Sequence, residues 1–595
     1  MALTKRGKWI SIALSVVVIL GGLWGWKKLN PPKAKSVEVK TKATSLPPLA
    51  YDKNANAPYR ELPSDETVDV QTPQIRGHLM EWYSQLGLCY AVGGKNTTKG
   101  SIAEELKLNV NLDVQNSCSK QAEDLYAFAE ELHAGNPQPT KGAHFIGWMG
   151  DGVPNYFSGL NARLKKDFGD EYVAKVITFG GASAGEDKWL LKKKYAANAK
   201  GSLTCTVLRD GDWNICIMKC QLMGWPVNHD QKTYDPDRVN FVAAPNDDYL
   251  EAAKFYASGQ KVTLKLVKNG KITDKDTLVT CTGVSTWFPG DLNAVKEKGG
   301  LVNVASTKDF GSQMPNALIF ISKWANDNKE LVENFCAMVG LGGDQIKSHR
   351  AALEFGAKAA KEVFASTMTE EDIVKAYSTY DMVDDDGNTV NIGGSRVFNL
   401  ADAANFTGVA GGSDKYKIVY NTFGNICVEA YPEVLSAFPT YEEATDWTFL
   451  RGAYNKYKSK AGNVSKIDFK DATKSNEILG DAAYSIEFNT GSATIKPSSY
   501  PTLDKILAQL NIADNSFVDL AGHTDNTGSD EQNIPLSKAR AESVRQYLVT
   551  KDADLAERFS QIKGYGSTKP LADNTTAEGK SKNRRVEIRL TRSKQ

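Results

Sequence analysis

Two residues near the C-terminus are of types that together can bind a charged ligand. Asp525 lies in the polar segment Gly522–Gly528 (GHTDNTG), and Arg540 lies early in the helix predicted to follow. A carboxylate accepts hydrogen bonds from an ammonium group, and a guanidinium binds a carboxylate through two parallel hydrogen bonds. Held together, the pair suits a zwitterion. The alternative is a salt bridge that only joins loop to helix, worth about 0–1 kcal/mol at a surface.

A small α/β layer is needed to hold these two residues in place. Residues 517–521 alternate as a strand, and the polar segment follows the carboxyl end of that strand, where α/β sheets bind ligands. The other elements predicted from apolar periodicity are two helices, over 500–510 and 535–548, and three short strands, over 484–488, 561–565 and 586–590. The sequence therefore predicts an α/β sandwich at the C-terminal end.

This part of the chain resembles the OmpA-like peptidoglycan-binding domain over about residues 483–592. The motif residues are Phe488, Gly491–Ala493, Gly522–Gly528, Asn533, Leu536–Ser537, Arg540–Ala541, Gly564–Gly566, Pro570, Asn574 and Asn583–Val586. The resemblance implies binding of the diaminopimelate side chain of the stem peptide, whose free end is a zwitterion, by Asp525 and Arg540. It also implies supporting positions at Thr524, Asn526, Asn533, Leu536 and Arg584.

The N-terminal segment 9–26 (WISIALSVVVILGGLWGW) carries no charge and has tryptophans at its ends. Its length lies near the lower limit for a transmembrane helix, about 17–25 residues. No small-x-small cleavage site and no lipoprotein cysteine follow, so we expect an uncleaved anchor rather than a signal peptide. Lysines on both sides leave the positive-inside rule ambiguous. Orientation therefore rests on the resemblance to a peptidoglycan-binding domain: residues 1–8 form a cytoplasmic tail, and a single-pass inner-membrane protein has its bulk in the periplasm.

Two polar stretches divide the rest of the chain. Residues 27–72 are rich in Lys, Pro and Ser and predict a periplasmic linker, and residues 456–482 predict a second linker. Residues 73–455 form an α/β body, and residues 483–595 form the C-terminal domain. In the body, apolar runs end in Gly-rich loops and alternate with helical segments, which is typical of a doubly wound parallel sheet. We interpret the run Gly180–Gly185 as a tight turn.

Residues 291–353 resemble the second lobe of a periplasmic solute-binding protein of the nitrate/taurine type, the substrate-binding component of ABC transporters. The segments that carry this resemblance are Ala305–Asp309, Met314–Pro315, Lys329–Met338 and Gly343–Lys347. The resemblance implies a type II fold, with two lobes that close on a small solute across a hinge.

Tryptophans, small hydroxyl residues and carboxylates in or near the predicted loops suit a pocket around a polar organic solute. The alternative is that the tryptophans are core or interlobe packing. The candidate solute-binding residues are Trp82, Trp148, Asp151, Ser183, Trp213, Thr286, Trp287 and Asp291.

Several function classes are disfavoured by composition and motifs. The net charge of +1 gives no reason to expect nucleic acid as a partner. The body has no hydrolase nucleophile motif, Walker loop or zinc signature, so we expect no enzyme, cofactor or metal site. Residues 384–387 (DDDG) lack a calcium loop's first and twelfth ligands and predict a hairpin turn instead. The eight cysteines fit either disulfides or buried free thiols.

Two functions follow. The first is a tethered receptor that binds peptidoglycan and senses or binds a small solute. The second is a scaffold without a solute, such as a wall-anchoring subunit of an envelope complex or ion-driven motor. Residues 9–26 contain no Asp or Glu, so in a motor a membrane-complex partner would have to supply the proton-conducting carboxylate.

Overall fold

The computed structural model describes residues 55–465, 468–489 and 491–594. The expected membrane helix over 9–26, the tail before it and the linker up to residue 54 lie outside the described residues. Across the ranges that are described, no helix is both long and apolar enough to cross a membrane.

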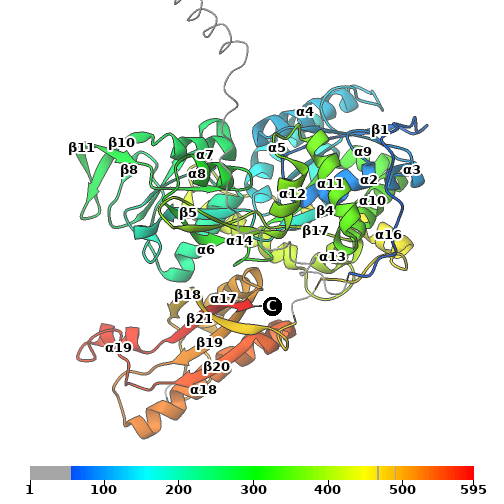
Figure 1. Cartoon of the computed structure of the whole chain (residues 1–595). Coiled ribbons are helices and arrows are strands. Elements are labelled where there is room, and N and C mark those ends of the chain that lie inside the picture. The colour runs from blue at the N-terminus through cyan, green and yellow to red at the C-terminus, as the bar shows by residue number, and fades with distance from the viewer. Residues whose placement is uncertain (1–54, 466–467, 490, 595) are drawn as a thin grey trace, which may run out of the picture. The chain divides into compact units, whose positions relative to one another are not determined.

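The first lobe of the body is built on a mixed sheet (Figure 1). Its strands are β1 (Gln74–Leu79), β2 (Asn109–Val114), β3 (Phe145–Met149), β4 (Ala174–Ser183), β14 (Pro315–Ile321) and β17 (Ser395–Val397). Their order in the sheet is β17-β4-β14-β3-β1-β2. Every residue of β14 is buried, as expected for a central strand covered on both faces.

The mixed α/β class is confirmed, but the sheet is not purely parallel as predicted. Strands β1, β2 and β3 pair in parallel, whereas β14 is antiparallel to both of its neighbours, β3 and β4. The reason is that β14 enters this sheet on the chain's return from the second lobe, so it runs against the strands laid down before it.

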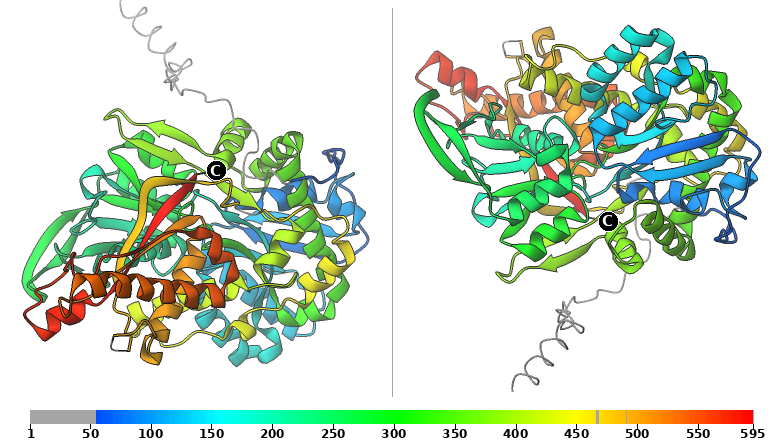
Figure 2. Two further views of the ribbon diagram at one scale, coloured as in Figure 1. Left: turned by 90° about the horizontal axis from the view of Figure 1, so that it is seen from below. Right: turned by 90° about the horizontal axis from the view of Figure 1, so that it is seen from above.

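Helices pack around the sheet of the first lobe (Figures 1 and 2). They are α2 (Leu86–Val92), α3 (Ile102–Glu105), α4 (Cys118–His133), α5 (Val153–Phe168), α9 (Ser322–Asp327), α10 (Lys329–Ser348), α11 (Arg350–Val363), α12 (Glu370–Ser378), α13 (Leu400–Phe406), α14 (Lys415–Ala430), α15 (Tyr441–Ala444) and α16 (Thr448–Tyr457). Several begin at side-chain caps: Ser117 accepts from the Lys120 amide at the start of α4, and Asp414 accepts from the Lys417 amide at the start of α14.

The second lobe has a mixed sheet of its own. Its strands are β5 (Lys188–Lys192), β6 (Leu203–Thr206), β7 (Val227–Asn228), β9 (Val239–Ala243), β12 (Gly283–Thr286) and β13 (Leu301–Ser306), in the order β13-β5-β12-β6-β9-β7. Its helices are α6 (Gly211–Met223), α7 (Tyr249–Ala257) and α8 (Gly290–Glu297). A smaller sheet contains β8 (Thr233–Tyr234), β10 (Lys261–Lys268) and β11 (Lys271–Thr280).

Within residues 55–465 the chain passes between the six-stranded sheets of the two lobes by two crossovers. It leaves the first lobe after β4 and returns between β13 and β14. The two crossovers are tied together, because Ser183 Oγ lies 2.5 Å from Thr307 Oγ1 and the Thr307 amide donates to the Asp187 carbonyl at 3.1 Å.

Gly180–Gly185 is not the tight turn that we predicted. Strand β4 continues through it to Ser183 and pairs with β17. At Gly181 an added Cβ would lie 2.3 Å from the carbonyl oxygens of both Arg396 and Ser84. The glycine is therefore needed for close backbone contact inside a strand. The prediction for residues 384–387 is confirmed, since they connect strands β15 (Tyr380–Val383) and β16 (Thr389–Ile392) of a hairpin.

The C-terminal domain is a sheet with helices packed on it (Figure 1). Its strands are β18 (Thr473–Tyr484), β19 (Ser516–Gly522), β20 (Phe559–Gly564) and β21 (Val586–Lys594), in the order β18-β21-β19-β20. Its helices are α17 (Tyr500–Ile512), α18 (Asp530–Lys551) and α19 (Ala577–Asn583), of which α18 contacts β19 and β20. Strand β18 starts within the stretch expected to be the second linker, because it pairs along its length with the last strand, from Thr473 with Lys594 to Tyr484 with Val586.

The described end of the first linker also differs from an extended tether. The Ala57 amide donates to Ser348 Oγ at 3.1 Å, Lys358 pairs with Asp65 at 2.7 Å, and Thr67 forms a bridge with Thr98. Residues 55–72 thus lie against the first lobe. All eight cysteines belong to the described ranges, and each is a buried free thiol, so the structure contains no disulfide among them.

Candidate functional site

The polar segment of the C-terminal domain lies directly against helix α18. Strand β19 ends at Gly522, where an added Cβ would lie 2.0 Å from the Ser537 carbonyl oxygen. Only a glycine allows this approach. Helix α18 starts at Asp530, earlier than predicted, and it includes Pro535. Arg540 therefore lies well inside the helix, and the loop after Gly522 passes close to it.

Asp525 is the anionic group of this site. It is largely buried, and its carboxylate accepts hydrogen bonds from Arg584 Nη1 at 2.5 Å and from the Thr527 amide at 2.9 Å. Burial by itself raises the pKa of Asp525, but the hydrogen bonds from Arg584 and Thr527 outweigh it and leave the pKa below its usual value. Asp525 is therefore ionised at neutral pH.

Arg540 is the cationic group, and it is not paired with Asp525. Its Nε donates to the Ser492 carbonyl at 3.1 Å, and its guanidinium lies 5.0 Å from the centre of the Phe488 ring. In the described part of the chain this is the only hydrogen bond of the Arg540 side chain, so both Nη groups remain available. Burial, and then the positive charge of Arg584, lower its pKa. The simple salt bridge between loop and helix that we considered is not formed.

The supporting residues hold the loop in shape. The Thr524 amide donates to the Gly566 carbonyl at 2.9 Å, Asn533 Nδ2 donates to the Thr527 carbonyl at 3.1 Å, and the Asn526 amide donates to Asn574 Oδ1 at 3.3 Å. Leu536 is half-buried on α18. Thr524 Oγ1 is buried and has no hydrogen-bond partner among the described atoms.

Two residues of this site were missed as site residues, although both lie in the recognised motif. Ser492 orients Arg540 through its backbone carbonyl, and Phe488 provides an aromatic face for the guanidinium. Their position in the opening strand and turn of the motif was visible. Their contact with a residue about 50 positions later was not.

The eight solute-binding residues predicted in the body are all at most 1% exposed. Asp151 lies where the two lobes meet. The lobes touch there, because Asp151 Oδ2 of the first lobe accepts from Asn214 Nδ2 at 3.0 Å in the second lobe. Tyr156 of the first lobe donates to Asp210 Oδ2 of the second at 2.9 Å. The structure thus has the lobes closed on each other.

Besides Asp151, three more of the eight residues have hydrogen-bond or ion-pair partners within the body. Ser183 ties the crossovers, Thr286 donates to the Tyr249 carbonyl at 3.0 Å, and Asp291 pairs with Lys188 in the interior. These three side chains hold the body together, so the prediction that they line a pocket lacks support from their contacts.

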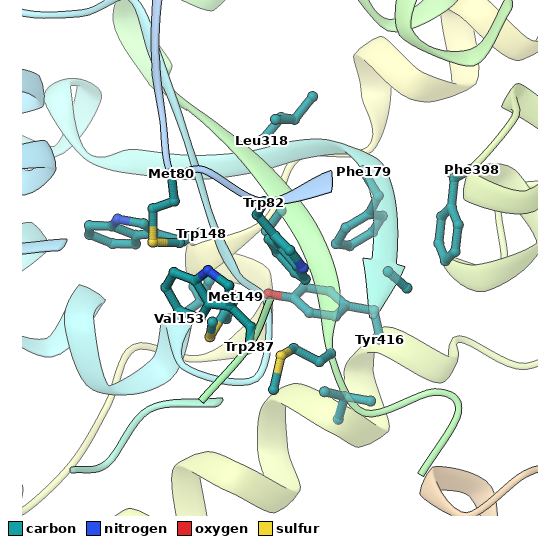
Figure 3. Close-up of a cluster of buried hydrophobic side chains, with 14 of the residues drawn as sticks. Met80, Trp82, Trp148, Met149, Val153, Phe179, Trp287, Leu318, Phe398 and Tyr416 are labelled. Carbon is teal, nitrogen blue, oxygen red and sulfur yellow. The ribbon is translucent and has the colours of Figure 1, made fainter. Parts of the chain in front are cut away.

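Three tryptophans come together. The side chains of Trp82, Trp148 and Trp287 gather with the thioethers of Met80 and Met149 (Figure 3). The fourth, Trp213, packs instead on Tyr431, with ring centres 5.6 Å apart.

A group of buried carboxylates near the crossovers was missed by the sequence analysis. It consists of Glu186, Asp187, Asp210 and Asp212, next to the predicted Asp151. Burial is the largest cause that raises the pKa of each; for Asp187 the value is about 7 and for Asp151 about 8. The available signal was the acidic pair Glu186 and Asp187, which lies between a Gly-rich stretch and the apolar run 189–191. No set of three or more His, Cys, Asp or Glu side chains in the described ranges is arranged to hold a metal ion.

Residues 487–584 match the model of the OmpA family. The chain is 40% identical over 116 residues to "Probable lipoprotein YiaD" of Escherichia coli, which is 20% of this chain and 52% of that protein. It is 42% identical over 103 residues to "Peptidoglycan-binding protein ArfA" of Mycobacterium tuberculosis, 17% of this chain and 31% of that protein. The chain thus spans about half of these relatives, or less.

A solved structure similar to the body is that of the periplasmic nitrate-binding protein NrtA from Synechocystis PCC 6803. It is 11% identical, covers 69% of this chain and 93% of that one, and has a TM-score of 0.41. For the C-terminal domain, the cell wall anchor of the T6SS from Pseudomonas aeruginosa is 30% identical, covers 21% of this chain and 89% of that one, and has a TM-score of 0.17.

Proposed function

We propose that this chain is a cell-envelope receptor that binds peptidoglycan through its C-terminal domain and a small solute through its two-lobed body. The observation that carries the first part is the pair of opposite charges at the corner of β19 and α18. Asp525 is ionised and its side chain is 11% exposed, and Arg540 keeps both Nη groups available.

This pair suits the free end of a diaminopimelate side chain, which carries an ammonium and a carboxylate on one carbon. The ammonium would donate to Asp525, and the carboxylate would accept from the Arg540 Nη groups in a two-bond fork. Arg584 would hold the Asp525 carboxylate in position. The match to the OmpA family over residues 487–584 supports this proposal, as does the similarity to a relative whose name states that it binds peptidoglycan.

The membrane anchor is part of the proposal. Residues 9–26 would span the inner membrane and hold the body in the periplasm, where the C-terminal domain reaches the wall. The receptor role of the body is supported by its two lobes, its paired crossovers and its interlobe hydrogen bonds. The alternative role is a scaffold within an envelope complex, with no solute. Its support is that Ser183, Thr286 and Asp291 have internal partners.

The wall-binding proposal is tested by co-sedimentation of the purified full chain with diaminopimelate-type sacculi. We expect the wild-type chain to sediment, and Asp525→Ala and Arg540→Ala to stay in solution. The matched controls are Arg545→Ala, on the same helix and ion-paired with Glu542 at 2.9 Å, and the exposed Asp530→Asn. Both controls should sediment like wild type. If wild type stays in solution, or if the controls lose binding as the test variants do, the proposal is wrong.

A further inference from the structure

Two carboxylates in the body are buried without any partner. Asp187 lies on the first crossover just before β5, and Asp212 lies in the first turn of α6. Both residues are fully buried, and none of their four carboxylate oxygens has a hydrogen-bond partner among the residues described. Buried carboxyl groups are usually hydrogen-bonded or paired, and burial raises the pKa of both groups here, so this region, within the described residues, lacks a donor or a positively charged group for them.

The neighbouring charges do not supply that group. Asp151 Oδ1 and Glu186 Oε1 are also buried and lack partners within the described ranges. The cation that opposes the raised pKa values of Asp187 and Asp212 is Lys188. Its Nζ is already bound, to Asp291 and to the Glu186 carbonyl at 2.7 Å. The region therefore has an excess of acidic groups over basic ones.

Aromatic side chains complete the region. The indole nitrogens of Trp82, Trp148 and Trp287 are buried and make no hydrogen bond to any described residue. Figure 3 shows these three side chains gathered together. Tyr249 connects them to the acidic group: its ring centre lies 4.3 Å from that of Trp287. Burial and then the charges of Asp210 and Asp212 raise its pKa.

We propose that the two lobes close on a small organic cation, a solute with an ammonium or amidinium group that donates to Asp187 and Asp212. Its carbon skeleton lies against the indoles of Trp82, Trp148 and Trp287. Aromatic faces attract such cations, and indole N–H groups can donate to acceptor atoms elsewhere on the solute. Anions such as nitrate are disfavoured by the unpaired carboxylates. This inference rests on the receptor role proposed above and names the class of its solute.

The test is thermal unfolding of the full chain with single added probes. The cationic probes are agmatine, putrescine and choline, and the anionic and zwitterionic probes are nitrate, sulfate and taurine. A solute that binds only the folded chain raises Tm progressively with its concentration. We expect at least one of the cationic probes to raise Tm and to quench tryptophan fluorescence. The anionic and zwitterionic probes should change neither.

The key variants are Asp187→Asn and Asp212→Asn. Each replaces a buried carboxyl group, unpartnered among the described residues, by a neutral amide of the same shape, so we expect the free chain to keep or increase its Tm. The affinity for the cation should fall at least about tenfold, as loss of a charge-assisted hydrogen bond predicts. An unchanged or higher Tm together with a lower affinity for the cation distinguishes a binding role from a purely structural one. The matched control is Asp344→Asn, a buried aspartate of the body that is bonded to Asn399 Nδ2 at 2.7 Å, which should keep cation binding.

The outcomes are distinguishable. Stabilisation by an anionic or zwitterionic probe and by no cation would overturn the cation assignment and leave the receptor role intact. Stabilisation by none of the six probes would overturn both. Cation binding that survives both Asp187→Asn and Asp212→Asn would also overturn the inference, because the site would then lie elsewhere.

Discussion

The Asp525 carboxylate accepts a hydrogen bond from Arg584 at 2.5 Å, although Arg540 lies on the adjacent helix. Arg584 follows α19, 59 residues further along the chain. The Asp525 carboxylate thus binds the guanidinium of Arg584, whereas the nearby guanidinium of Arg540 has both Nη groups free of partners among the described residues. The bound arginine keeps Asp525 ionised and oriented, and the free one is left to bind the anionic end of a ligand.

We predict that Arg584→Gln makes wall binding sensitive to acid. Burial raises the pKa of Asp525, and the hydrogen bond from Arg584 lowers it. The substitution removes this hydrogen bond, so the pKa of Asp525 should rise. The carboxylate then becomes protonated at a higher pH, and binding of an ammonium group is lost as the pH falls. Sacculus co-sedimentation from pH 7 to pH 4 measures this. We expect binding about tenfold weaker at neutral pH, from the loss of one charged hydrogen bond in the site.

Wild type should bind across most of this range. Equal acid sensitivity of wild type and Arg584→Gln would show that Arg584 does not control the charge of Asp525. Arg545→Ala is again the control, since its ion pair is with Glu542, an exposed residue, and not with Asp525.

Arg558→Ala should destabilise the C-terminal domain. This buried guanidinium donates to the carbonyl oxygens of Leu510 and Ala513 at 2.7 Å and of Ser516 at 2.9 Å. Without it, the Leu510 and Ser516 carbonyls lose the Arg558 donor, and the Ala513 carbonyl keeps the Ser516 hydroxyl as a donor. We expect a cost of about 3 kcal/mol in the free energy of unfolding. Urea unfolding of the full chain, followed by a probe in the C-terminal domain, tests this. A change below about 0.5 kcal/mol, the size expected for an ordinary surface substitution, would contradict it.

Gly522→Ala should destabilise the same domain for a steric reason. The new Cβ would lie 2.0 Å from the Ser537 carbonyl oxygen, so α18 has to move away from the end of β19. Overpacking of this kind costs about 1–3 kcal/mol. Wall binding should weaken as well, because the same movement separates Asp525 from Arg540. Gly159→Ala is the control: no atom lies within 4 Å of its added Cβ, and the residue is in helix α5. That change should be neutral or slightly stabilising.

The solute-free body should become less stable as the pH rises from about 4 to about 8. Burial raises the pKa of Asp151 from 3.8 to about 8. Between these two values the folded chain keeps a proton that the unfolded chain has lost, so the free energy of unfolding falls with increasing pH. Asp151→Asn removes this titration. The decrease in the free energy of unfolding between pH 4 and pH 8 should then be smaller, by an amount on the order of a few kcal/mol.

Urea unfolding at pH 5 and at pH 8 measures the difference. The exposed Asp170→Asn should keep the wild-type dependence, since the Asp170 side chain is 76% exposed. An Asp151→Asn chain with the same pH dependence as wild type would show that Asp151 is ionised in the folded body.

The sequence by itself determined several local elements, and it pointed to Asp525 and Arg540 as two candidate residues of opposite charge. Apolar alternation and helical spacing located α17, β19 and β20 to within a few residues, because burial on one face is written into neighbouring positions. The motif around Asp525 and Arg540 marked both residues as candidates, because polar residues follow the end of a strand there. The start of α18 was missed, because Pro535 suggested the first turn of a helix rather than its interior.

The tertiary structure decided which distant groups meet. Periodicity is a local property, so it contains no information that Arg584 binds Asp525, that Lys188 binds Asp291, or that β14 returns antiparallel to β3. The acidic group around Asp187 forms only because two crossovers bring separate strand ends of both lobes together. The choice between disulfides and free thiols was decided in the same way, since a disulfide needs two cysteines close in space, whatever their spacing in the chain.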